Sequence, residues 1–146
     1  MRSIYWLALA TLLFVLPGCS FSSAPSWLQG DWIFDLDASQ KAAAEPAKPP
    51  PSGGGMLDGM ANALFGMLLP SFSGMELKIT DKEVMAMMNG NGETLTYEVI
   101  SSVPDQECLI KQSDGKLVTF YKAGDEIYRY PDKGGSKFKV FFKRKS

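Results

Sequence analysis

Few side chains in this chain are able to do covalent or acid–base chemistry. It contains two cysteines, Cys19 and Cys108, and 16 acidic residues, but no histidine. Without an imidazole it cannot build a Ser-His-Asp triad, a Cys-His nucleophile pair or a histidine-ligated metal site. Asp35 and Asp37 would share the outer face of one strand, where they are predicted to be solvated carboxylates. The sequence therefore predicts no enzyme, no catalytic residue, no metal and no other cofactor.

Charge and length exclude further classes of protein. The chain has 15 Lys and Arg residues against 16 Asp and Glu residues, which gives a formal net charge of -1. A nucleic-acid surface needs a basic patch, so nucleic-acid binding is not expected. The length of 146 residues suits one domain.

The N-terminus has the features of a targeting segment. Arg2 precedes an uncharged, apolar stretch that runs from Ile4 to Leu16. A helix rises about 1.5 Å per residue, so this stretch is too short to cross about 30 Å of hydrocarbon. Its length fits the apolar core of a signal peptide.

Leu16 is followed by Pro17-Gly18-Cys19, and these four residues together resemble the lipobox of bacterial lipoproteins. The resemblance implies that residues 1–18 are removed as a signal peptide and that Cys19 becomes the lipidated first residue. Two or three acyl chains anchor a protein stably, because each buried methylene contributes about 0.8 kcal/mol. Ser20 follows, and by the same resemblance the protein faces the periplasm from the outer membrane of a Gram-negative cell. In another organism it would sit on the cell membrane.

Two alternatives to lipidation stay open, an ordinary secretory signal that happens to contain a cysteine and an N-terminal membrane anchor. If Cys19 carries lipid, Cys108 has no partner for a disulfide within the chain. Cys108 alternates with Ile110, which predicts a buried thiol that packs as a small hydrophobic side chain.

The rest of the chain divides into a tether and one domain. Residues 19–26 are expected to be a short tether, and residues 27–146 a single domain. Within that domain, residues 38–55 combine alanines with a triple proline and a triple glycine. This composition predicts a flexible linker.

Residues 56–69 are predicted to form a Met-rich apolar helix that Pro70 ends. One face of this helix would carry Leu57, Met60, Ala61, Leu64 and Leu68. Because such a helix is not stable alone in water, its apolar face must be buried. It could cover the domain as a lid, lie on the membrane or a partner protein, or fill the core; a methionine copper site is not favoured because no histidine supports it.

Most of the domain shows the period-2 alternation and the turn residues of antiparallel β-structure. Asn-Gly and Asp-Gly pairs between the runs favour hairpins. We predict a mainly β fold, an eight-stranded antiparallel up-and-down barrel with one helix inserted between strands 1 and 2. The predicted strands are 32–37, 75–79, 84–88, 94–100, 107–112, 116–122, 126–130 and 137–143.

An eight-stranded barrel is either filled by side chains or holds one small ligand. The alternation predicts an inner face made of Trp32, Phe34, Leu36, Leu77, Ile79, Leu95, Tyr97, Val99, Cys108, Ile110, Val118, Phe120, Phe138, Val140 and Phe142. The candidate ligand-binding residues are Trp32, Phe34, Tyr97, Phe120, Met60 and Leu64.

Gly30-Asp31-Trp32 at the first strand resembles the Gly-x-Trp motif of lipocalins, and Arg144 matches the basic residue that packs on that tryptophan. The resemblance implies a small lipocalin-like barrel that Gly30, Trp32 and Arg144 close at one end. In the alternative interpretation, Trp32 is a large core residue and Arg144 belongs to a solvated basic tail.

Two functions are compatible with these features. The first is a lipid-anchored, periplasm-facing protein that binds a small hydrophobic ligand inside the barrel. The second is a protein-interaction module, an envelope assembly accessory or inhibitor, whose barrel is filled and whose partner is another envelope protein.

Overall fold

A computed structural model describes residues 23–44, 64–131 and 138–146. The predicted signal peptide, Cys19 and Met60 lie outside the described residues, as do residues 45–55 of the predicted linker. The described strands are β1 (Gly30–Asp35), β2 (Met75–Ile79), β3 (Glu83–Met88), β4 (Asn91–Val103), β5 (Glu107–Gln112), β6 (Leu117–Ala123), β7 (Glu126–Arg129) and β8 (Val140–Arg144).

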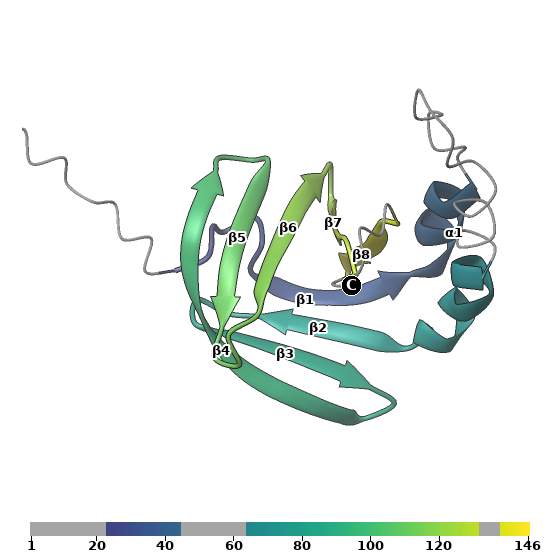
Figure 1. Cartoon of the computed structure of the whole chain (residues 1–146), viewed down its shortest axis with the longest axis horizontal. Coiled ribbons are helices and arrows are strands. Elements are labelled where there is room, and N and C mark those ends of the chain that lie inside the picture. Colours follow the sequence, from purple (N-terminus) through teal and green to yellow (C-terminus); the bar gives the residue numbers. More distant parts are fainter. Residues whose placement is uncertain (1–22, 45–63, 132–137) are drawn as a thin grey trace, which may run out of the picture.

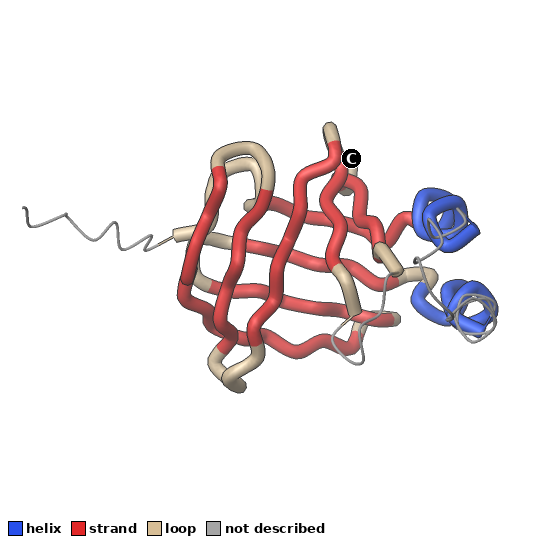
Figure 2. Tube along the Cα trace, turned by 45° about the horizontal axis from the view of Figure 1, so that its top comes forward, coloured by secondary structure: helices blue, strands red, loops and turns tan. Residues whose placement is uncertain are grey.

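The eight strands form a closed antiparallel barrel in sequence order, which confirms the predicted fold class. Each strand pairs with its neighbours in the chain, and β1 also pairs with β8, with Trp32 opposite Arg144 and Phe34 opposite Phe142. This last pairing leaves no free sheet edge in the barrel. Figures 1 and 2 show the strands wrapped around one interior, with residues 23–29 and the helices at opposite ends.

The two ends of the barrel are therefore distinct. We call the end where residues 23–29 enter β1 the closed end, and the end where β1 leads into a helix the mouth. The closed end also carries the β4–β5 and β6–β7 turns, because successive strands alternate in direction. β4 changes partner along its length, pairing with β3 up to Thr96 and with β5 from Tyr97 onward.

β1 ends two residues earlier than predicted, and α1 (Leu36–Ala44) follows it directly. The prediction of a strand through Asp37 was thus wrong, as was the prediction of a flexible linker for residues 38–44. Asp35 caps the helix, since its Oδ1 accepts a hydrogen bond of 2.9 Å from the Ala38 amide. Four alanines, with Asp37 in the first turn and Lys41 in the last, favour the helix over the strand.

A second helical segment covers the mouth beside α1 (Figure 1). Residues 64–68 are α-helical and continue into the short 3-10 helix η1 (Leu69–Phe72), which has Pro70 in its first turn. Residues 64–69 are thus helical as predicted, and residues 56–63 lie outside the described part of the chain.

Most of the predicted inner face is buried in one core. Its largest fully buried side chains include Trp32, Phe120 and Phe142. Leu36, Val99 and Val140 pack on the core but are only partly buried. The alternation did not identify five further core residues, Ala24, Leu28, Leu69, Val84 and Ile127.

Candidate functional site

Trp32 and Arg144 lie in contact at the closed end. The guanidinium carbon of Arg144 sits 4.4 Å from the centroid of the Trp32 ring, which is a cation–π contact. Arg144 also donates hydrogen bonds of 3.1 Å to the carbonyls of Gln29 and Trp27. The Trp32 indole N–H in turn donates to the Leu28 carbonyl at 2.9 Å. These contacts hold residues 27–29 across the end of the barrel.

Gly30 allows Arg144 to reach this position. Its φ of +136° lies in a region that side-chain-bearing residues rarely adopt, and a Cβ built on Gly30 would collide with Arg144 Nη1. The glycine, the tryptophan and the arginine therefore depend on one another, in the arrangement that the lipocalin resemblance implies. The structure is an eight-stranded barrel compatible with a lipocalin-like fold.

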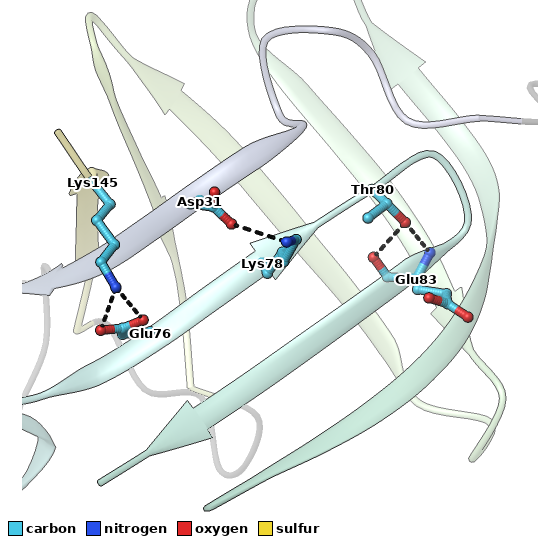
Figure 3. Close-up of polar contacts among 6 residues, drawn as sticks. All are labelled: Asp31, Glu76, Lys78, Thr80, Glu83 and Lys145. Carbon is cyan, nitrogen blue, oxygen red and sulfur yellow. Dashed lines mark hydrogen bonds and ion pairs between the residues drawn. The ribbon is translucent and has the colours of Figure 1, made fainter. Parts of the chain in front are cut away.

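Polar contacts on the outside of β1 and β2 attach Lys145 to the wall of the barrel (Figure 3). Lys145 Nζ lies 2.9 and 2.8 Å from the two carboxylate oxygens of Glu76, and the Lys145 amide donates to the Asp31 carbonyl at 2.9 Å. Lys78 Nζ lies 3.9 Å from Asp31 Oδ1. Both side chains are about half exposed, so this ion pair contributes little to the stability of the fold.

The candidate ligand-binding residues on the strands are packed against the core. Trp32, Phe34, Tyr97 and Phe120 are between 1% and 8% exposed. Phe34 contacts the rings of Phe142 and Phe72 at centroid distances of 6.1 and 6.2 Å. Met60 lies outside the described residues.

Tyr97 has its hydroxyl occupied as well. It donates a hydrogen bond of 2.5 Å to the Thr80 carbonyl, and burial raises its pKa to about 12. This hydroxyl is thus neutral near pH 7 and serves to link β4 to the β2–β3 turn.

Two of these residues border hollows at the surface. Tyr97 lines a hollow of about 680 Å³ where β4 changes partner, together with polar residues such as Lys82, Glu98 and Lys111. Trp32 lines a hollow of about 170 Å³ at the closed end with Trp27 and Arg144. Phe34 and Phe120 line neither hollow. The described strand residues of the predicted ligand site, Trp32, Phe34, Tyr97 and Phe120, are therefore buried side chains of the core cluster.

The helical segment at the mouth has an inner and an outer side. Leu69 is fully buried, and Phe65 stacks on Phe138 with ring centroids 4.4 Å apart. Leu64, Met67 and Leu68 are instead exposed by 59%, 79% and 58%. The prediction that Leu64 and Leu68 lie on the buried face was wrong, because Phe65 and Leu69 occupy that face.

The prediction that Asp35 is a solvated carboxylate was wrong, because only 7% of the residue is exposed. Its Oδ2 lies 3.0 Å from Lys143 Nζ, in addition to its hydrogen bond from Ala38. Burial alone would raise the pKa of Asp35, but the hydrogen bonds from Ala38 and Lys143 and the charge of Lys143 together lower it below 3.8. Asp35 thus binds β8 and α1 to the end of β1.

This lowered pKa predicts how stability changes with pH. The ionised form of Asp35 stabilises the fold at pH values above its unfolded pKa of about 3.9, and this contribution is lost as the pH falls through the lower folded pKa. Replacing Asp35 by asparagine should therefore lower the midpoint of urea unfolding at pH 7 by more than at pH 3. Asp31→Asn, whose side chain is 57% exposed, is the control. An equal loss for Asp35→Asn at both pH values would contradict this role.

Cys108 is fully buried, and burial raises the pKa of its thiol to about 11. Reactive cysteines need a lowered pKa and access to solvent, so this thiol packs in the core as predicted. Within the described residues there is no group of three or more Cys, Asp and Glu side chains that could hold a metal ion.

Comparisons with known proteins identified no relative. No protein-family model, curated protein or solved structure matches this chain. In the described part of the chain, no helix is both long and apolar enough to cross a membrane.

Proposed function

We propose that this protein is a lipid-anchored envelope protein whose filled barrel presents a protein-binding surface at its mouth. The observation that carries this proposal is the exposure of Leu64, Met67 and Leu68 on one side of a helical segment whose other side is packed on the barrel. Exposed apolar side chains that lie together on a rigid element are typical of interaction sites.

The packing of the interior supports this function over ligand binding. Phe34 contacts Phe72 and Phe142, while Phe120 is 1% exposed. A hydrophobic ligand would therefore have to displace side chains at the mouth, including Leu69 and Phe72. A surface for a protein partner requires no such displacement.

The position of the tether favours a protein partner over the membrane for this surface. Residues 23–29 lie at the closed end, where Ser23 and Trp27 line a hollow with Pro104 of the β4–β5 turn, and the helical segments lie at the opposite end (Figure 1). A lipidated Cys19 would be four residues before Ser23, which places the closed end within roughly 14 Å of the bilayer at full extension. The mouth then points away from the bilayer that holds the anchor.

Photo-crosslinking in intact cells tests whether the exposed surface at the mouth binds a protein. A photoreactive amino acid replaces Met67 in the full chain, with Leu117 as the control because it is 55% exposed on β6. We expect one discrete protein adduct at Met67, its loss when Leu68 is changed to Asp, and none at Leu117. Equal adducts at both positions, or adducts with lipid alone, would contradict a protein-binding mouth.

The anchor and the rival function are tested on the same material. Globomycin or Cys19→Ser should block removal of residues 1–18, and an unchanged mature mass would contradict lipidation. Native mass spectrometry of gently extracted protein should show no bound apolar molecule. A stoichiometric bound lipid would favour ligand binding instead.

A further inference from the structure

Four aromatic side chains gather on the outer face of the barrel at β6, β7 and β8. We call Tyr121, Tyr128, Tyr130 and Phe141 the tyrosine cluster. Tyr121 stacks on Tyr128 with centroids 5.0 Å apart, and Tyr128 lies 5.2 Å from Phe141. Tyr130, which directly follows β7, meets the rings of Tyr121 and Tyr128 edge-on, at 5.6 and 5.9 Å. All four residues are partly exposed, so the cluster is a surface and not a part of the core. Arg129, between two of the tyrosines, alternates with them and points to the other face.

Two charged side chains border the cluster on opposite sides. Glu107 on β5 stands opposite Tyr121, and the row of opposed residues continues through Tyr128 to Phe141 on β8. Lys139 comes two residues before Phe141 and so lies on the same face, where its Nζ is 4.9 Å from the centroid of the Tyr128 ring. Neither Glu107 nor Lys139 has an ion-pair partner within the described residues.

The other charges beside the cluster have partners in the same chain. Lys143 Nζ lies 3.0 Å from Asp35 Oδ2, and Lys143 also stands opposite Glu126 in the sheet register. Lys122 Nζ lies 2.7 Å from Asp105 Oδ1. The charges that remain for another molecule at the border of the cluster are therefore one carboxylate and one ammonium.

This arrangement of rings and charges is self-complementary. Glu107 and Lys139 are separated across the sheet by three strand spacings, about 14 Å, and the point midway between them falls within the cluster. A two-fold axis through that point and parallel to the sheet places Glu107 of each copy against Lys139 of the other. The same axis brings the aromatic rings of the two copies together. A symmetric dimer requires such a surface, in which each group meets the group that its symmetry mate presents.

From this complementarity we propose that the tyrosine cluster is a homodimer interface in which Glu107 of each copy pairs with Lys139 of the other. Tyrosine and other aromatic residues are preferred at the centres of protein interfaces. Lys139 keeps its contact with Tyr128 in this dimer, because an ammonium group has three donors. The interface lies on the wall of the barrel and does not use Leu64, Met67 or Leu68, so it is independent of the proposed binding surface at the mouth.

Sedimentation velocity of the full chain in detergent tests the dimer. We expect the protein mass to rise from one chain to two between low and high micromolar concentration. Glu107→Lys and Lys139→Glu should each weaken association about tenfold or more, because each reversal places like charges together twice in a symmetric contact. Lys78→Glu makes the same change on β2, outside the cluster, and should leave association unchanged.

Mixing the two single variants shows whether the contact joins two chains. In the mixed dimer, both contacts again pair a lysine with a glutamate, so an equimolar mixture should associate to within about threefold of the unaltered chain. A contact within one chain could not be restored by mixing. Circular dichroism checks that each variant is folded.

Three results would overturn the proposal. The unaltered chain could stay monomeric at every concentration, which would leave the cluster to a different partner or to none. Either charge reversal could leave association unchanged, or the mixture could fail to associate more tightly than each variant alone.

Discussion

Replacing Trp32 by alanine is expected to destabilise the protein by about 3–5 kcal/mol, as is typical for a buried tryptophan. The indole is 2% exposed, fills the closed end and donates a hydrogen bond to the Leu28 carbonyl. The same substitution removes the surface on which Arg144 lies. Urea unfolding followed by circular dichroism measures the loss.

The contact with Arg144 should appear as a coupling between the two residues. Arg144→Ala loses two hydrogen bonds to backbone carbonyls at an exposed site, which should cost about 1–2 kcal/mol. The double variant should lose about 0.5–1 kcal/mol less than the two single losses added together. Arg144→Lys keeps the charge but cannot bridge both carbonyls as a planar fork, so we expect it to recover only part of the stability.

Additive losses would mean that Arg144 and Trp32 act independently. In that case Arg144 would belong to a solvated basic tail, the alternative interpretation of the sequence.

Leu69→Ala is the second substitution with a large expected effect, about 2–5 kcal/mol. Leu69 is fully buried in the core, whereas the preceding residue, Leu68, is 58% exposed to solvent. Leu68→Ala makes the same chemical change one position away and should cost no more than about 0.5 kcal/mol. The two midpoints of urea unfolding give the comparison directly.

This pair of variants also separates the two sides of the segment at the mouth. Leu68→Ala should reduce partner binding with little loss of stability, and Leu69→Ala should do the reverse. Equal destabilisation by both would contradict the packing of Leu69 under the segment, and with it the orientation on which the proposed function depends.

The barrel could be predicted because alternation determines which side chains face its interior. The runs 75–79 and 107–112 have the same bounds in the structure as in the prediction. Hydrophobic burial on one face fixes the register of such strands. The contact of Trp32 with Arg144 followed from a resemblance and not from periodicity, since the two residues are far apart in the sequence.

The role of Asp35, the burial of Leu28 and the orientation of the segment before Pro70 depend on tertiary contacts that the alternation of side chains does not show. Asp35 alternates with its neighbours as an outward strand residue would, yet its carboxylate caps α1 and pairs with Lys143. Leu28 is fully buried, but it lies in an irregular segment, where no periodicity indicates which side chains face the core. In the nearly uncharged segment before Pro70, no polar face set the orientation, so the stacking of Phe65 on Phe138 decided which side faces the barrel.

The pairing of β1 with β8 has a consequence for how the chain folds. Arg144 donates a hydrogen bond to the Gln29 carbonyl across a sequence separation of 115 residues, so the ring of strands closes only when β8 pairs with β1. Non-local pairing of this kind slows folding. Until β8 arrives, β1 has an unpaired edge that could join to another chain. Loss of β8 would therefore leave β1 and β7 as two open edges and give the sheet a strong tendency to aggregate.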